Sequence, residues 1–126
     1  MICHHNITAI IVDDEQDARE LLEIILHDIE IIDIVGEFNS IEPAIEFIIT
    51  NQPQLVFLDI NMPGKNGFEL VEEIRSLQLN PTIIFTTAHS EYSIQAIENE
   101  AFGYLIKPIN PDKLRKVIHR FSCRNN

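Results

Sequence analysis

Short runs of apolar residues alternate along this chain with stretches in which apolar residues recur every three or four positions. Five such runs, rich in Ile, Val, Leu and Phe, occupy residues 10–12, 31–35, 55–59, 82–86 and 102–106. Short, nearly continuous apolar runs predict strands that are buried on both faces. The chain is therefore expected to alternate strands with helices around a parallel sheet.

The stretches between these runs carry apolar residues at the spacing of one helix face. The predicted faces are Ala18, Leu21, Leu22 and Ile25; Ile41, Ile45, Ile48 and Ile49; Phe68, Val71 and Ile74; and Leu114, Val117, Ile118 and Phe121. Capping residues mark three helix starts, at Ser40, at the pair Asn66 and Glu69, and at Asn110 before Pro111. The apolar pattern is weakest over residues 90–100, so the helix predicted there is expected to pack least firmly against the sheet.

Five strand–helix units predict right-handed βαβ connections and an α/β fold with helices on both faces of the sheet. A chain of 126 residues forms one domain, long enough to fold without a disulfide or a structural metal. We place this domain at residues 1–121. The polar residues 122–126 are expected to be a frayed end or the start of a linker.

Charge and composition limit the classes of protein to which this chain can belong. The chain has 20 acidic and 9 basic residues, and its net charge of -11 would repel nucleic acid. The absence of a long apolar stretch and of a signal-peptide pattern predicts a soluble, cytoplasmic protein without a membrane span. Cys3 and Cys123 are expected to be reduced thiols, and Cys3, His4 and His5 are adjacent residues of a terminus that rarely share one metal geometry.

Polar residues follow four of the five predicted strands. Asp13 and Asp14 end the first, Asp59 the third, Thr87 the fourth and Lys107 the fifth. Because the carboxyl ends of parallel strands meet at one sheet edge, these side chains are expected to converge there. Three carboxylates suit Mg²⁺, and their mutual repulsion requires a cation in addition to Lys107.

Asp59 is the candidate nucleophile, because a carboxylate can attack phosphorus and hold the group as an acyl phosphate. The turn-rich loop 61–67 offers the carbonyl of Asn61 as a further metal ligand and backbone amides as phosphoryl donors. Thr87 and Lys107 are candidates to bind phosphoryl oxygens.

Simpler interpretations of these residues stay open. Asp14 could be a helix N-cap, the loop an ordinary turn, Thr87 a structural residue and Lys107 a solvated surface residue. Pro108 is a candidate for a cis peptide bond.

Together these motifs resemble those of response-regulator receiver domains of bacterial two-component signalling. The resemblance extends from about Thr8 to Phe121 and depends on five motifs: residues 13–15, residues 59–64, residues 87–88, Tyr104 and residues 107–108. It implies a flavodoxin-like doubly wound (βα)5 fold with five parallel strands in the order 2-1-3-4-5. It also implies that a sensor histidine kinase phosphorylates Asp59, that Asp13, Asp14, Asp59 and the Asn61 carbonyl hold Mg²⁺, and that Thr87 and Lys107 bind the phosphoryl oxygens.

Residues 86–109 resemble receivers of the LytTR subgroup, whose parent proteins carry a C-terminal DNA-binding domain. Two organisations follow from this resemblance. The chain is either the receiver part of a longer transcription regulator or a stand-alone receiver of a phosphorelay. In both cases nucleic acid is not expected to bind this domain.

The resemblance also suggests how phosphorylation becomes a signal. The phosphoryl group would draw the Thr87 hydroxyl inward, and Tyr104 would fill the vacated space. The face formed by the helix over 90–100, the strand over 102–106 and the helix after Pro111 would then form a homodimer or dock an output domain. Asn61 and His89 are expected to tune the lifetime of the acyl phosphate, unless His89 is simply a solvent-facing loop residue. Tyr104 could equally be a half-covered aromatic of an edge strand.

Three rival classes fit less well. A haloacid-dehalogenase-type phosphatase, which would turn over many substrates, needs a second Asp where this chain has Asn61. A flavodoxin-like carrier needs a hydroxyl-rich phosphate loop where residues 13–15 are acidic. A degenerate receiver would lack an acid or the lysine. The sequence therefore predicts a self-phosphorylating signalling domain rather than a turnover enzyme.

Overall fold

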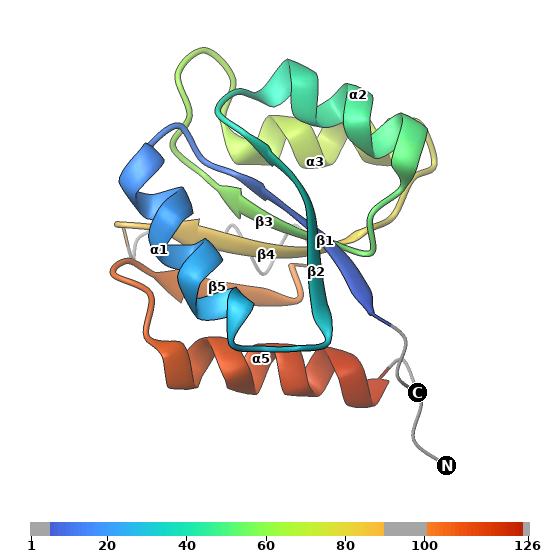
Figure 1. Ribbon diagram of the computed structural model, residues 1–126. Helices are drawn as coiled ribbons and strands as arrows, with labels where there is room; N and C mark the ends of the chain where they lie inside the picture. Colours follow the sequence, from blue (N-terminus) through green and yellow to red (C-terminus); the bar gives the residue numbers. More distant parts are fainter. Residues whose placement is uncertain (1–5, 90–100, 125–126) are drawn as a thin grey trace.

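The protein folds around a five-stranded parallel sheet (Figure 1), seen in a computed structural model that describes residues 6–89 and 101–124. The strands are β1 (Ile7–Val12), β2 (Ile32–Phe38), β3 (Leu55–Asp59), β4 (Thr82–Thr87) and β5 (Gly103–Ile106). Their order is β2-β1-β3-β4-β5, and every pairing is parallel. The predicted fold and strand order are confirmed.

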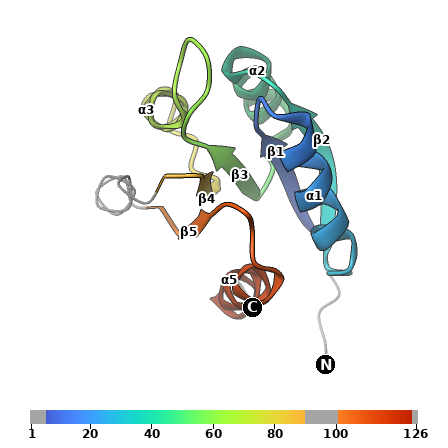
Figure 2. The same ribbon diagram turned by 90° about the vertical axis from the view of Figure 1, so that its left-hand side faces the viewer.

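Helices cover both faces of this sheet. In the part that the structure describes they are α1 (Gln16–His27), α2 (Ile41–Asn51), α3 (Gly67–Ser76) and α5 (Pro111–Arg124). Figure 2 shows α2 and α3 on one side of the sheet and α5 on the other. The helix expected over 90–100 and the Cys3-His4-His5 cluster lie outside the described residues. Helix α5 includes residues 122–124, so the expected tail begins inside a helix, and its role as a linker stays a prediction.

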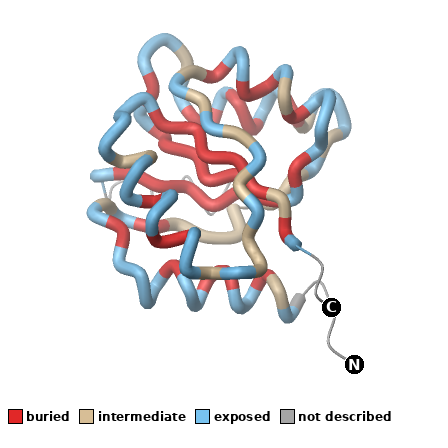
Figure 3. Tube along the Cα trace, viewed as in Figure 1, coloured by how far each residue is buried: buried red, intermediate tan, exposed pale blue. Residues whose placement is uncertain are grey.

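Two apolar cores lie on opposite faces of the sheet, because successive side chains of a strand point to opposite sides. One core joins β1, β3 and β4 to α2 and α3, and the other joins β1, β3, β4 and β5 to α1 and α5. Figure 3 shows the buried residues concentrated along the central strands. All five residues of β3 are buried, including its last residue, Asp59. Asp59 is therefore carried on the most enclosed strand of the fold.

Two residues of the predicted apolar helix faces are exposed. Leu21 of α1 is 41% exposed and Ile49 of α2 is 45% exposed, so these two members of the predicted faces lie outside the buried stripes. The buried stripes instead contain Leu26 and Ala44, which were not predicted. The pattern gave the helix period correctly, but runs of adjacent apolar residues do not tell which edge of the stripe meets the sheet.

Capping confirms two of the predicted helix starts. Asn66 and Glu69 each accept a hydrogen bond from the other's backbone N–H, which is the predicted capping box of α3. The Asn110 side chain accepts from the backbone N–H groups of residues 112 and 113 at the start of α5. Ser40 occupies the N-cap position of α2 without a side-chain capping bond, and the N-cap residue of α1 is Glu15, not Asp14.

None of the helices within residues 6–89 and 101–124 combines the length and the apolar character that crossing a membrane requires.

Candidate functional site

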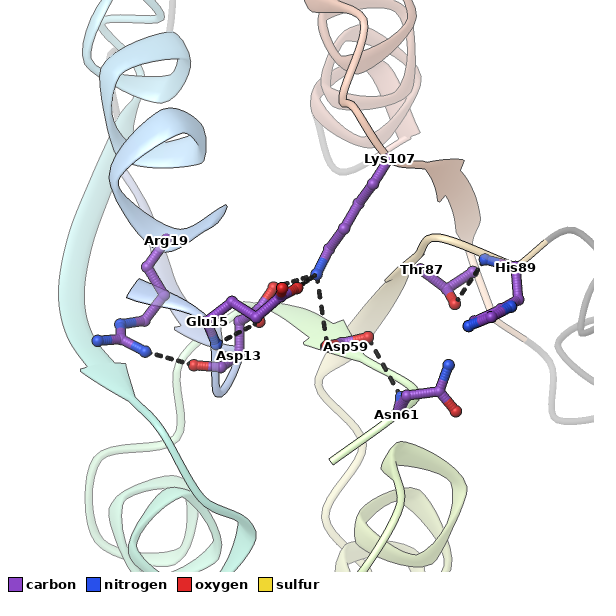
Figure 4. Close-up of polar contacts among 8 residues, drawn as sticks. All are labelled: Asp13, Glu15, Arg19, Asp59, Asn61, Thr87, His89 and Lys107. Atoms are coloured by element: carbon purple, nitrogen blue, oxygen red, sulfur yellow. Dashed lines mark hydrogen bonds and ion pairs between the residues drawn. The ribbon is translucent and has the colours of Figure 1, made fainter. Parts of the chain in front are cut away.

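The carboxyl ends of β1, β3 and β5 bring three charged residues into contact with one another (Figure 4). The Lys107 Nζ atom lies 2.7 Å from Asp13 Oδ2 and 3.4 Å from Asp59 Oδ2. Both aspartates are 4% exposed. The predicted convergence is confirmed for Asp13, Asp59 and Lys107. Glu15 also contacts this lysine, 3.2 Å from Nζ to Oε1, a contact that the sequence analysis did not predict.

Three carboxylates gather at this edge with the spacing of a metal site. Asp13, Asp14 and Asp59 each offer an oxygen, and these oxygens all lie within 4.8 Å of one another. An all-oxygen donor set from two buried acids and one exposed acid fits Mg²⁺, which takes few protein carboxylates and keeps several waters. The N–H of Asn61 donates to Asp59 Oδ1 at 3.2 Å, so the loop after β3 folds back onto Asp59. The role of the Asn61 carbonyl as a metal ligand stays a prediction.

Asp13 is fixed by local hydrogen bonds at the β1–α1 turn. Its N–H donates to the carbonyl of Phe38 at 2.9 Å, and its Oδ1 accepts from the N–H of Glu15 at 2.9 Å. The Arg19 Nη1 donates to the Asp13 carbonyl oxygen at 2.6 Å. Sequence reasoning missed Arg19. The available signal was a basic residue in the first turn of the helix that follows an acidic motif.

Two glycines shape the loop after β3 in different ways. Gly64 has a φ of +84°, which a residue with a side chain rarely adopts. Gly67 has no positive φ, but a Cβ there would lie 2.8 Å from the carbonyl oxygen of Asp59. Gly67 thus lets α3 begin directly against the end of β3. The left-handed backbone conformation in this loop is therefore found at Gly64 and not at Gly67.

Hydroxyl groups lie on the other side of Asp59. Thr87 is fully buried, and its Oγ1 accepts a hydrogen bond from the N–H of His89 at 3.1 Å. The Tyr104 hydroxyl donates to the carbonyl oxygen of the same His89. In Figure 4, Thr87, His89 and Asn61 lie on the side of Asp59 that faces away from Asp13. Tyr104 is half-buried on the edge strand β5.

The charges around Asp59 favour the binding of a cation. Burial, with the charge of Asp13 second, raises the pKa of Asp59 from its ordinary 3.8 to about 6, while Lys107 and the Asn61 N–H oppose the shift. Burial lowers the pKa of Lys107, but its contacts with Asp13 and Asp59 outweigh burial and raise it overall. Lys107 therefore stays charged, and one ammonium faces several carboxylates. The peptide bond between Lys107 and Pro108 is cis, as the sequence suggested.

Comparison with known proteins gives a consistent result. Residues 9–119 match the family model of the response regulator receiver domain. The chain is 34% identical over 112 residues to the sensory transduction protein LytT of Bacillus anthracis, and 44% identical over 114 residues to the transcriptional regulatory protein BtsR of Salmonella typhi. These matches cover 89% and 90% of the chain but 46% and 47% of the two relatives, so the chain spans about half their length.

Among solved structures, the response regulatory domain of mrkE from Klebsiella pneumoniae is similar, with a TM-score of 0.85 and 31% sequence identity. The match covers 93% of this chain and 96% of that domain. The predicted family resemblance is confirmed, and LytT among the relatives agrees with the predicted subgroup.

Proposed function

Because the chain belongs to the response regulator receiver family, we propose that Asp59 accepts a phosphoryl group from a sensor histidine kinase. The observation that carries this proposal is the buried Asp59 carboxylate, with Lys107 at 3.4 Å and two further carboxylates beside it. Family membership argues against the phosphatase and electron-carrier alternatives. The domain keeps the group on itself and is not a turnover enzyme.

In the transfer step an oxygen of Asp59 forms the new bond to phosphorus, while the bond from phosphorus to the donor nitrogen breaks. Asp13, Asp14, Asp59 and the Asn61 carbonyl would hold Mg²⁺. When bound, the ion neutralises the charge of the phosphoryl oxygens. Its absence would leave the carboxylates repelling an anionic donor, because Lys107 supplies only one positive charge.

Lys107 and Thr87 have different tasks in this proposal. Lys107 approaches one oxygen of Asp59 from β5 and pairs as a point charge with a phosphoryl oxygen. Thr87 exchanges its hydrogen bond from His89 for a hydrogen bond donated to another phosphoryl oxygen. Asn61 and His89 line the approach to the acyl phosphate, and we propose that they set its lifetime.

A groove that begins at Asp13 and Lys107 supports docking of the kinase. It has a volume of about 420 Å³ and extends from Asp13 and Lys107 to Leu21 and Pro108. Leu21 is exposed on α1 although a leucine there would be expected in the core. An apolar contact next to an acidic pocket would let a donor protein bind while its phosphohistidine reaches Asp59.

We propose that the signal of phosphorylation is transmitted through the side of the site that contains Thr87 and Tyr104. Tyr104 on β5 donates a hydrogen bond to the carbonyl of His89, whose N–H donates to Thr87. Strand β5 and helix α5 border a groove of about 880 Å³. Five basic residues contribute to its lining: Lys113, Arg115, Lys116, His119 and Arg120. We propose that phosphorylation changes the face formed by the helix predicted over 90–100, β5 and α5, which then forms a homodimer or docks an output domain.

The transcriptional role is likewise a proposal. BtsR is named a transcriptional regulatory protein, and the chain matches about half of it, which leaves room in such a relative for a DNA-binding output domain. DNA would bind that domain and not the receiver, whose sequence is strongly acidic. We place the protein in the cytoplasm, where a histidine kinase would reach it.

Intact mass measurement tests the chemistry. The protein is incubated with Mg²⁺ and a small phosphodonor, and Asp59→Asn is compared with the matched control Asp33→Asn, which changes an exposed acid on β2. We expect wild type and Asp33→Asn to gain one phosphoryl group and Asp59→Asn to gain none. A phosphoryl group on Asp59→Asn, or none on wild type, contradicts the proposal. Chelation of Mg²⁺ should prevent the gain in every sample.

A further inference from the structure

Asp13 is held at both its main chain and its side chain. Its N–H and its carbonyl oxygen are bound by Phe38 and Arg19, and its two carboxylate oxygens by Glu15 and Lys107. Arg19 and Lys107 are the two cations among these partners. They approach Asp13 from different sides and bind different atoms.

The difference between the two cations matters once a metal ion is present. Lys107 binds Asp13 Oδ2, on the side of the pocket that contains Asp59. Arg19 binds the main-chain oxygen, and Figure 4 shows its guanidinium on the side of Asp13 opposite Lys107. A cation among the carboxylates would compete with Lys107 for the Asp13 carboxylate. It would leave the Arg19 contact intact, because that contact uses no carboxylate oxygen.

Arg19 is itself well placed to act as a fixed support. Its side chain is only 18% exposed, and its Nε lies 3.9 Å from Glu37 Oε1 on the edge strand β2. Guanidinium is always charged and presents its N–H groups in a rigid plane. The short Arg19 contact is a charge-assisted hydrogen bond, a class stronger than neutral ones. Arg19 thus ties α1 to the end of β1, with Glu37 as its outer partner.

We propose that Arg19 is a positioning residue for the metal site. By holding the Asp13 carbonyl it fixes the turn that directs the Asp13 carboxylate toward Asp59. Its own positive charge repels a second cation, so the role we propose is one of geometry and not of charge. The inference relies on the proposed function, because the ion concerned is the Mg²⁺ required there. Groups that orient metal ligands in this way typically change metal affinity by about 10- to 100-fold when removed.

The test is titration of Mg²⁺ alone, followed by calorimetry or by backbone amide chemical shifts, with no phosphodonor present. Arg19→Gln should weaken Mg²⁺ binding about tenfold, because the shorter side chain no longer holds the Asp13 carbonyl oxygen. Loss of the Arg19 charge acts in the opposite direction, since a nearby positive charge repels Mg²⁺. Arg19→Lys should weaken binding about threefold, since it keeps the charge but loses the planar fork. Glu37→Gln is the matched control, because it removes the outer partner of Arg19 and leaves the contact between Arg19 and Asp13, and its Mg²⁺ affinity should stay within about twofold of wild type.

Urea unfolding without metal shows which variants are folded, and only folded variants are compared. If Arg19→Gln does not fold, Arg19→Lys carries the test. Wild-type affinity in the Arg19 variant that folds, or an equal loss in Glu37→Gln, overturns the positioning role. Failure of wild type to bind Mg²⁺ overturns both this role and the proposed metal site. Normal binding by wild type together with normal binding by the Arg19 variant overturns only the role of Arg19.

Discussion

The two sides of Asp59 are built from different interactions. The acidic side consists of Asp13, Glu15, Arg19 and Lys107, which are joined by ion pairs and charge-assisted hydrogen bonds. The hydroxyl side consists of Thr87, His89 and Tyr104. Both of its hydroxyl groups bond the main chain of His89, and neither of these bonds involves a charged group.

This difference suits the acidic side to binding a cation and the hydroxyl side to a change of conformation. Asp13 on the acidic side is anchored at the end of a central strand and has an excess of negative charge around it, so a cation can enter without a rearrangement of the backbone. A neutral hydrogen bond contributes a net of only about 1 kcal/mol. The Thr87 hydroxyl can therefore give up the hydrogen bond that it accepts from His89, and donate to a phosphoryl oxygen instead, at low cost. We infer that the acidic side binds and the hydroxyl side moves.

The largest effect that tests this comparison is loss of metal binding. Asp13→Asn should weaken Mg²⁺ binding at least about a hundredfold, equivalent to about 3 kcal/mol, because it removes one of two buried carboxylate ligands. Thr87→Val is the matched variant on the hydroxyl side, and its Mg²⁺ affinity should remain within about twofold of wild type. Titration calorimetry measures both. Equal losses would show that the two sides are not functionally separate.

The next effect is a pH dependence of stability caused by Asp59. Its folded-state pKa of about 6 lies above its ordinary 3.8, so the folded state binds the proton more tightly than the unfolded state. Stability contributed by the protonated form is therefore present below pH 4 and is lost as the pH rises to about 6. Asp59→Asn avoids this loss. Its free energy of unfolding relative to wild type should rise by about 2 kcal/mol between pH 4 and pH 7.

Urea unfolding at a series of pH values without Mg²⁺ measures this difference. Added Mg²⁺ should reduce the difference at pH 7, because a bound cation stabilises the ionised carboxylates of wild type. A constant difference between the two proteins across this pH range would show that Asp59 is not destabilised by its surroundings. Binding of a cation would then relieve no electrostatic repulsion on the acidic side.

The architecture could be predicted from the sequence because each predicted strand is a short apolar run and the topology places all the carboxyl ends at one edge. The bounds predicted for β3, 55–59, agree with the observed Leu55–Asp59. The convergence of Asp13, Asp59 and Lys107 followed from the same rule and needed no knowledge of side-chain conformation. Polar residues at strand ends were therefore the most informative positions of the chain.

Other features depend on tertiary packing and could not be predicted. Whether Leu21 is buried depends on how far α1 rotates about its axis, and adjacent apolar residues leave this rotation open. Arg19 and Glu15 have long side chains whose partners are set by rotamers and by the neighbouring strand. The need for Gly67 arises from the close approach of α3 to Asp59, which no local pattern reveals.

The smallest predicted effect concerns the hydroxyl side alone. Tyr104→Phe should lower the free energy of unfolding by about 1 kcal/mol, through loss of one hydrogen bond, and leave Mg²⁺ affinity unchanged. Because Thr87 and Tyr104 both bond His89, the double variant Thr87→Val with Tyr104→Phe should deviate from additivity by about 0.5 kcal/mol or more. Urea unfolding of the four proteins gives this coupling energy. Additive effects would mean that a change at Thr87 is not felt at Tyr104, and the proposed switch would lose its physical connection from Asp59 to β5.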